Sequence, residues 1–386
     1  MSKFSNWSCH RALKYAFSLL FIFTALTGCS IFNNTSSKLK PAILENNISA
    51  FEIHQVWTSR VGTGMKVPMG VNVSGNLVTI ASADGTIASI DSTTGHDVWR
   101  ISLGERLSAG VGSDGKMAAV VLRTNVLIGI DSGSVRWREQ LTAQVFTPPL
   151  VAGGRIFVLA ADRSIAAYDA ASGQRLWIQR RVGEPLILRH SGVLMAIEDT
   201  LVVGSSGSLL GLDPNSGSIR WDARVGAARG TNDVERLVEL VGPIARLGTN
   251  VCVRAYQSAV GCVDAKRGDV SWTHAANGAE GVDGDKDVLI GVEGNGKVIA
   301  WRRSNGERIW ETDRLLYRKL TAPLLLGRSV VIGDESGLLH FLSKVDGLPL
   351  NRLQTDASGL VNAPVVSGAT LIVFARNGNV YGYRPD

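Results

Sequence analysis

Short apolar runs separated by turn residues recur along most of the chain after residue 50. In one unit they cover Leu150–Ala152, Arg155–Ala160, Ser164–Asp169 and Arg175–Trp177, and they are rich in Val, Ile and Leu. Short runs bounded by Gly, Asp and Ser predict β-strands, whereas a long helix would need an apolar period of about 3.6 residues. No long stretch beyond the N-terminal segment has that period, so the pattern predicts an all-β protein.

Each unit closes with the same local sequence, an Asp, a turn ending in Gly, and a Trp four residues after the Gly. Full copies end at Trp99, Trp177, Trp221 and Trp272, a shortened copy ends at Trp137, and altered copies keep Gly306 with Trp310 and Gly347 with Asn351. Trp57 stands alone near the start. Intervals of about 40 residues are typical of four-stranded propeller blades. The eight positions predict an eight-bladed β-propeller of four-stranded antiparallel blades.

The two ends of the repeat complete each other. Trp57 ends an apolar run that lacks the three preceding strands of a blade. The last run, Asn379–Tyr383, is a third strand with no fourth strand after it. We expect Phe51–Ser59 to be the fourth strand of the last blade, which leaves no open sheet edge. In each unit the Gly should supply φ > 0 in a tight turn, and the Trp should cover the gap to the next blade with its indole N–H on a backbone carbonyl.

The first 28 residues, with basic positions followed by an apolar run, predict a signal peptide. Leu26–Cys29 resembles the bacterial lipobox, in which Cys29 would carry the lipid; the alternative is an ordinary signal peptide with a chance cysteine. In the lipobox interpretation, Ser30 favours the outer membrane, with the protein on its periplasmic face. Residues 29–50 are then a lipidated, flexible polar tether, and residues 51–386 are the propeller.

The net charge and the cysteine content exclude few classes of function. The net charge of +6 includes three positive residues in the first 28, so the remaining chain is weakly basic and gives no case for nucleic acid. Cys252 and Cys262 flank a predicted hairpin centred on Gln257, which makes them cross-strand neighbours. They form either a disulfide or two buried free thiols, and their spacing does not fit zinc.

No catalytic constellation is visible. The six histidines are scattered without ligand spacing, and no nucleophile elbow or phosphate-cradling loop occurs. Asp283 and Asp285 begin like a calcium loop, but Val288 and Gly294 stand where that loop needs Gly and Glu, so a surface turn is favoured. The sequence predicts no enzyme, no cofactor and no metal site.

Two long connections interrupt the repeat, after Trp177 and after Trp221. They join fourth strands to the next first strands in consecutive blades, so they should be neighbours on one rim, where function usually lies. The first contains Leu186, Leu188 and Arg189, a composition that suits a protein interface. The second, Asp233–Leu240, could form a short amphipathic helix. The alternative is that the leucines pack into the core and the second insert has no role.

The repeat in Ala167–Trp177 resembles the pyrroloquinoline-quinone-type propeller repeat. Eight such units behind a lipobox resemble the BamB family of outer-membrane assembly lipoproteins over nearly the whole chain. The most specific part is Leu186–Arg189, because the family carries Leu-x-Leu-Arg in a loop that contacts the POTRA domains of the assembly channel BamA. The resemblance implies that Leu186, Leu188 and Arg189 are contact residues.

The second contact of that family is acidic and aligns with Val234–Val241. Glu239 keeps the first acid and Val241 replaces the second, unless the contact has shifted toward Glu235. The resemblance implies a non-catalytic scaffold that helps insert outer-membrane proteins. An exposed propeller could also offer strand edges or a rim groove to unfolded outer-membrane substrates. The alternatives are a propeller lipoprotein with another periplasmic partner, or a quinoprotein dehydrogenase. Such dehydrogenases are longer and carry adjacent cysteines that this chain lacks.

Overall fold

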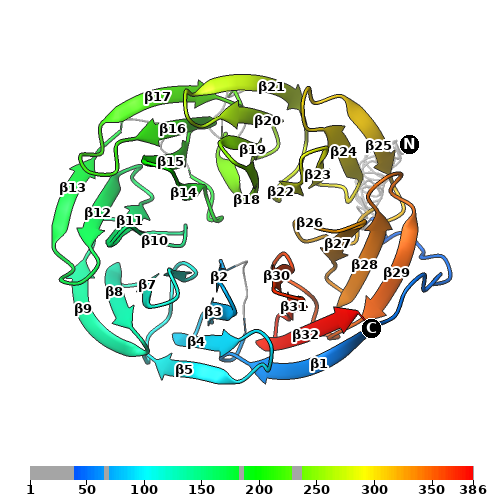
Figure 1. Ribbon diagram of the computed structural model, residues 1–386, viewed down its shortest axis with the longest axis horizontal. Helices are drawn as coiled ribbons and strands as arrows, with labels where there is room; N and C mark the ends of the chain where they lie inside the picture. Colours follow the sequence, from blue (N-terminus) through cyan, green and yellow to red (C-terminus); the bar gives the residue numbers. More distant parts are fainter. Residues whose placement is uncertain (1–38, 65–68, 182–186, 228–236, 386) are drawn as a thin grey trace, which may run out of the picture. The chain divides into compact units, whose positions relative to one another are not determined.

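The computed structural model describes residues 39–64, 69–181, 187–227 and 237–385. Within these ranges the chain forms eight four-stranded antiparallel sheets arranged as the blades of a propeller (Figure 1). In each blade the first strand lies nearest the centre of the ring and the fourth lies on its outer circumference (Figure 1). No helix in the described ranges is long and apolar enough to cross a membrane.

Seven blades use four consecutive strands each. The first four are β2 (Asn72–Ser74), β3 (Leu77–Ala81), β4 (Thr86–Asp91) and β5 (Asp97–Ser102); β6 (Gly112–Ser113), β7 (Met117–Val121), β8 (Val126–Asp131) and β9 (Ser134–Gln140); β10 (Leu150–Ala152), β11 (Arg155–Leu159), β12 (Ile165–Asp169) and β13 (Arg175–Gln179); β14 (Leu194–Ile197), β15 (Thr200–Ser205), β16 (Ser208–Leu212) and β17 (Ile219–Arg224).

The next three are β18 (Leu240–Leu247), β19 (Asn250–Ala255), β20 (Ala259–Asp264) and β21 (Asp269–Ala275); β22 (Val282–Gly284), β23 (Val288–Val292), β24 (Val298–Arg302) and β25 (Arg308–Thr312); β26 (Leu324–Leu326), β27 (Ser329–Gly333), β28 (Leu338–Ser343) and β29 (Pro349–Gln354). The eighth blade combines β30 (Val365–Ser367), β31 (Thr370–Phe374) and β32 (Asn379–Pro385) with the N-terminal β1 (Ile53–Arg60). The predicted closure is confirmed, with Trp57 opposite Gly382.

The burial of the strands explains why they differ in sequence. The middle strands, such as β3 and β4, are buried almost throughout because both of their faces contact neighbouring blades. They therefore appear as continuous apolar runs. The outer strands alternate between exposed and half-buried residues, as β9 does over its whole length, because one face is in water. Blade-to-blade packing of the middle strands forms the core.

Most of the repeated tryptophans bond across the seams between blades as predicted, but the buried indole nitrogen of Trp221 has no hydrogen-bond partner among the described residues. Five indole N–H groups donate to a backbone carbonyl in the next blade: Trp57 to Ser92 (3.0 Å), Trp137 to Ala170 (2.9 Å), Trp177 to Pro214 (3.0 Å), Trp272 to Arg303 (2.8 Å) and Trp310 to Lys344 (2.9 Å). Each accepting residue lies one position into the turn before the next outer strand. The tryptophan therefore links one outer strand to the turn that leads into the following one.

The turn glycines have a second role that the sequence pattern did not reveal. Gly217 has φ +74°, as the turn prediction requires, but a Cβ atom there would also lie 2.6 Å from the ring of Trp177 in the preceding blade. Gly95 stands in the same relation to Trp57, at 2.7 Å. Within one repeat, the Gly therefore packs at the seam with the preceding blade and the Trp at the seam with the following blade. A side chain at the Gly would displace the indole of the preceding blade.

Asn351 occupies the Trp position of the seventh blade, and the structure gives a reason for this difference. The next blade has no third-to-fourth-strand turn, because its fourth strand is β1. Instead, the Asn351 amide donates to the Phe51 carbonyl at 2.7 Å and accepts from the Asn47 amide at 3.0 Å. The ring of Phe51 packs edge-on against Phe341 with centroids 5.3 Å apart. The incoming chain fills the space that an indole fills elsewhere.

Residues 41–50 lie against the ring before β1 begins. The Ala42 N–H donates to the Leu316 carbonyl at 2.9 Å, in the connection after β25. Leu44 packs against the core cluster between the sixth and seventh blades. This part of the predicted tether therefore contacts the sixth blade before the chain reaches the eighth.

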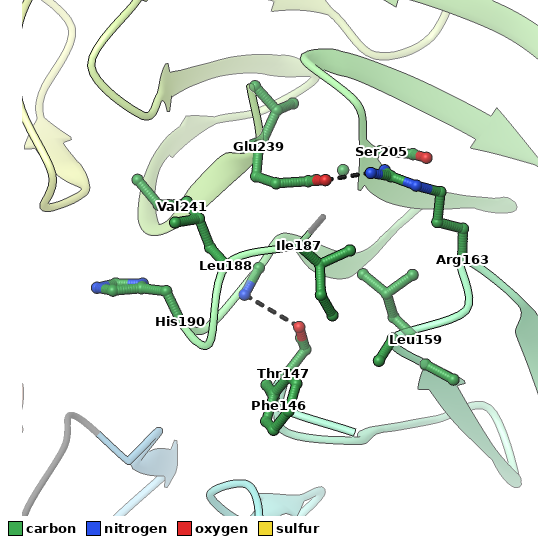
Figure 2. Close-up of a pocket in the computed structure, with 15 residues that line it drawn as sticks. Phe146, Thr147, Leu159, Arg163, Ile187, Leu188, His190, Ser205, Glu239 and Val241 are labelled. Carbon is green, nitrogen blue, oxygen red and sulfur yellow. Dashed lines mark hydrogen bonds and ion pairs between the residues drawn. The ribbon is translucent and has the colours of Figure 1, made fainter. Parts of the chain in front are cut away.

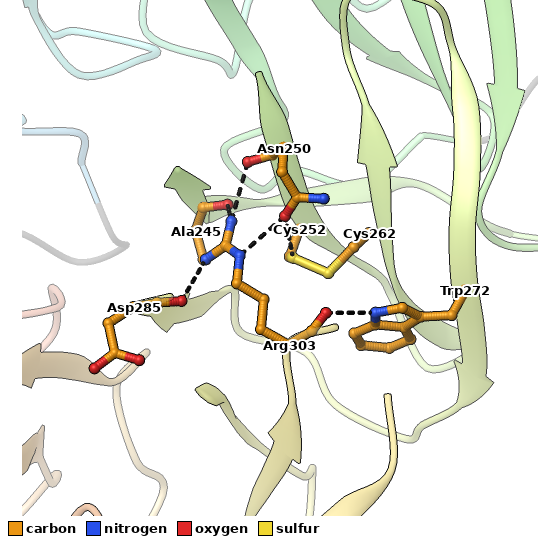
Figure 3. The surroundings of a disulfide bond; sticks show 7 residues. All are labelled: Ala245, Asn250, Cys252, Cys262, Trp272, Asp285 and Arg303. Atoms are coloured by element: carbon orange, nitrogen blue, oxygen red, sulfur yellow. Dashed lines mark hydrogen bonds between the residues drawn. A yellow bond between two sulfur atoms is a disulfide. The ribbon is translucent and has the colours of Figure 1, made fainter. Parts of the chain in front are cut away.

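The two cysteines are opposite each other on β19 and β20, as the hairpin prediction requires. In the structure they form a disulfide that is fully buried, beside the Arg303 guanidinium, which reaches from the sixth blade to the carbonyls of Ala245 and Asn250 (Figure 3). The bond therefore lies at the seam between the fifth and sixth blades.

Replacing both Cys252 and Cys262 with alanine is expected to lower stability by about 2–3 kcal/mol, because a disulfide closing a short loop restricts the unfolded chain by about that amount. Urea denaturation of wild type and variant, with and without reductant, measures it. Reductant should bring the wild type to the stability of the variant and leave the variant unchanged. Equal stability of the two proteins without reductant would contradict the expectation.

Candidate functional site

The two long connections lie on one rim of the ring, between β13 and β14 and between β17 and β18. Both join an outer strand to the next inner strand. The structure describes residues 180–181 and 187–193 of the first and residues 225–227 and 237–239 of the second. Three predicted site residues, Cys29, Leu186 and Glu235, lie outside the described residues. The second connection ends earlier than the sequence indicated, because β18 begins at Leu240 and continues past Pro243 through a register shift.

The loop at residues 187–192 presents one apolar and one basic side chain at the surface. Leu188 is half-buried and Arg189 is exposed, with the guanidinium carbon 5.2 Å from the centre of the Phe146 ring. The backbone N–H of Gly192 donates to the Thr147 hydroxyl at 3.0 Å (Figure 2). The loop is therefore fixed to the preceding connection between β9 and β10, and an aromatic face supports the arginine.

Behind this loop lies a small cavity of about 50 Å³. Its walls include Phe146 and Leu188 from two connections and Leu159 at the end of β11 (Figure 2). Leu240 at the start of β18 lines it as well. Leu188 thus has one side against the cavity and one side toward solvent. The sequence left open whether Leu188 packs into the core or is free for a partner. In the structure it is half-buried, neither sealed in the core nor fully exposed.

Glu239 is not a free acid on the rim. Its carboxylate lies 2.8 Å from the Arg163 guanidinium, and the two side chains are only 16% and 8% exposed (Figure 2). A second carboxylate oxygen accepts from the Ser206 N–H at 3.3 Å. Burial raises the pKa of Glu239, and Arg163 partly offsets that effect. Glu239 therefore joins the turn between β11 and β12 to the start of β18.

Val241, which stands where the resemblance leads one to expect a second acid, is 1% exposed and packs under the same loop. Taking a carboxylate out of water at this position would be costly, whereas the valine fits the local packing. The acidic contact is therefore absent at residue 241. The sequence pattern gave no sign that Arg163, in a turn of the third blade, and Phe146, in the connection leading into that blade, would complete the site.

His190 and Glu280 also meet at this rim, and the sequence did not connect them. The imidazole Nε2 lies 3.8 Å from a Glu280 carboxylate oxygen, with 18% and 27% of the side chains exposed. Both residues line a larger cavity of about 370 Å³ formed by the inner strands and their approaches, where Met69, Met195 and Ile244 supply apolar walls. His190 lines the small cavity as well, so it separates the two.

The acidic turn at residues 283–287 has a structural role. The Asp285 carboxylate accepts from the N–H groups of Asp287 and Val288 and pairs with Lys344 at 2.8 Å. Asp283 accepts from the Leu325 N–H of the next blade at 2.7 Å. Among the residues that the structure describes, no group of three or more acidic, His or Cys side chains could hold a metal ion.

Comparisons with known proteins agree with the fold and the repeat. Residues 83–312 match the family described as "Outer membrane protein assembly factor BamB". The chain is 36% identical to a protein of that name from Burkholderia pseudomallei, over 86% of this chain and 88% of the relative. It is 26% identical to the protein of that name from Escherichia coli, over 93% of this chain and 95% of the relative.

Solved structures show the same architecture. BamB from Moraxella catarrhalis superposes with a TM-score of 0.79 at 23% identity, covering 86% of this chain and all of that one. Quinohemoprotein alcohol dehydrogenase from Comamonas testosteroni gives 0.65 at 13% identity, covering 89% and 78%. At these identities both likenesses show the fold alone. The family model matches more than half of this chain, and one relative is 36% identical to it. The chain therefore belongs to the BamB family.

Proposed function

We propose that this protein is a non-catalytic assembly factor for outer-membrane proteins and that its loop at residues 187–192 docks on the POTRA domains of BamA. Family membership supports the general role, because the relatives are named as outer-membrane protein assembly factors. One observation carries the docking site: Leu188 and Arg189 are both accessible on a loop that is fixed at Gly192 and braced by Phe146.

The chemistry of the loop suits a protein partner. A half-buried leucine beside an exposed arginine gives an apolar anchor with a charged neighbour, the combination that dominates interface energetics. Because Arg189 lies over an aromatic ring, less side-chain freedom is lost when it binds. In the same proposal, Leu186 and Glu235 extend the contact from the adjacent segments, which lie outside the described residues.

Glu239 would then act through the structure of the rim and not by touching the partner. Replacing it with alanine removes a carboxylate from a largely buried guanidinium, which is expected to cost about 2 kcal/mol and to weaken partner binding less than a change at Leu188. Thermal unfolding and binding titration measure the two effects. Glu311→Ala, which breaks two ion pairs of more exposed side chains, with Lys297 and with Arg308, is the control and should change little.

We further propose that Cys29 carries the lipid that anchors the protein to the periplasmic face of the outer membrane, after removal of residues 1–28. Residues 29–50 would link the anchor to the ring, with residues 41–50 contacting the blades. Mass spectrometry of the N-terminal peptide tests this directly. An acylated peptide beginning at Cys29 supports the anchor, and an unmodified peptide contradicts it.

Copurification tests the docking proposal. The tagged full-length protein is extracted in mild detergent, and the proteins that it retains are identified by mass spectrometry. Recovery of BamA supports the proposal, whereas recovery of a different periplasmic complex supports the alternative of another partner. Transient retention of unfolded outer-membrane proteins would support the further possibility that the outer strand edges receive substrates, since residues such as Leu176 on β13 are exposed there.

A further inference from the structure

The loop that presents Leu188 and Arg189 is continuous with His190, and His190 is placed to sense protons. Its Nδ1 lies 3.2 Å from the Ser191 carbonyl oxygen, so Nδ1 carries a hydrogen and donates. In the neutral ring the lone pair is then on Nε2, and that atom is buried without a hydrogen-bond partner. The atom faces the Glu280 carboxylate at 3.8 Å.

This arrangement favours the protonated ring. A neutral imidazole would direct a lone pair at a carboxylate, whereas an imidazolium places an N–H and a positive charge there. Burial opposes the charged ring, but the Glu280 carboxylate outweighs that effect, and the pKa of His190 is raised from its ordinary value. Protonation therefore converts a poor contact between two connections into an ion pair.

The other charged groups around His190 are already committed. Arg163 pairs with Glu239 at 2.8 Å on the wall of the small cavity. Arg254, fully buried on β19, pairs with Glu293 at 3.0 Å, and Glu280 also acts on its charge. His190 is the only histidine among the described residues that line the two cavities, and histidine is the side chain whose ordinary pKa lies near neutral pH.

We infer that His190 and Glu280 form a proton-dependent clasp that holds the loop at residues 187–192 in its docking position. The clasp joins the approach to the fourth blade to the approach to the sixth, across the mouth of the larger cavity. Because it holds the residue next to Arg189, its loss frees the loop that presents both contact side chains. His190 and Glu280 are positioning residues in this scheme, and the partner need not touch them.

The direction of the pH effect follows from the raised pKa. The pair contributes fully below the ordinary histidine pKa of about 6.5 and is lost as the pH rises through the higher value in the folded protein. Partner affinity should therefore be greater in a mildly acidic medium than in an alkaline one. This last consequence rests on the proposed function, whereas the clasp itself does not.

Two measurements on the full chain test the clasp without a partner. The His190 ring protons, followed by NMR against pH, should titrate above the ordinary histidine value in the wild type and at a lower pH in Glu280→Gln. Hydrogen exchange of residues 187–192, corrected for its intrinsic pH dependence, should increase as His190 loses its proton. It should not respond to pH in His190→Gln. His96→Gln, at an exposed turn, is the matched control and should behave as the wild type does.

Binding to purified BamA POTRA domains gives the functional result. Affinity of the wild type should fall at least about fivefold between pH 6 and pH 8.5, and this dependence should disappear in His190→Gln and Glu280→Gln. An unchanged His190 titration in Glu280→Gln, or loop exchange that ignores pH, overturns the clasp. Absence of POTRA binding at every pH overturns the proposed function instead, while the two partner-free measurements still decide the clasp.

Discussion

Replacing Leu188 with aspartate is expected to abolish retention of BamA and to weaken binding by about 2 kcal/mol or more, which is roughly thirtyfold. The change puts a charge where the partner would meet an apolar surface, on a side chain that also lines the small cavity near Glu239. Arg189→Glu should have a comparable effect through charge reversal. Affinity is measured by titration with POTRA domains, and retention is measured by copurification.

A matched control separates the docking loop from general surface chemistry. Leu176→Asp makes the same substitution at an exposed leucine on β13 of the adjacent blade, 47% exposed, and should leave binding intact. Circular dichroism and the unfolding temperature show whether the Leu188 variant still folds. If a folded Leu188→Asp protein binds as tightly as Leu176→Asp does, the loop is not the docking site.

Replacing Trp57 with alanine is expected to destabilise the protein by about 3–5 kcal/mol, the usual range for a buried aromatic residue. Trp57 is 7% exposed, donates to Ser92, and packs where Gly382 leaves room for its ring. Because it lies on β1, the change should also release the closing strand. Hydrogen exchange should therefore rise along β1 and β32, and urea denaturation should show the stability loss.

Trp177→Ala is the comparison for that result, since Trp177 makes the same kind of bond to Pro214 within the ring. It should lower stability without raising exchange in β32. Similar exchange patterns in the two variants would mean that the closing seam is no weaker than an internal one. A stability change below about 1 kcal/mol for Trp57→Ala would contradict the sealing role.

The repeat was visible in the sequence because the chemistry of each blade is local. A Gly with positive φ recurs in seven of the blades, a Trp follows it four residues later in six of them, and the middle strands are apolar. The blade number and the closure by an N-terminal strand could therefore be predicted. The contact between Gly217 and Trp177 could not, because it joins two repeats and depends on how far one blade is rotated against the next.

The site was harder to predict for the same reason. The unusual loop lengths pointed to the rim on which the proposed docking loop lies, and Arg189 is exposed there. The pairing of Glu239 with Arg163, and of His190 with Glu280, depends on side chains about 75 and 90 residues apart that the ring brings together. A single sequence gives each of these residues the appearance of an ordinary surface charge.

The closing blade has a consequence for the order of events in biosynthesis. β1 is the first of the described strands to be synthesised, and its partner β32 is the last. Until the C-terminus is released, β1 has no strand to pair with, and the two ends must meet across nearly the whole chain, a slow step for any fold. In a chain that stops before residue 379, β1 would lack its pairing strand, and its unpaired backbone would be exposed to proteolysis. A stable product therefore requires that β32 has been synthesised.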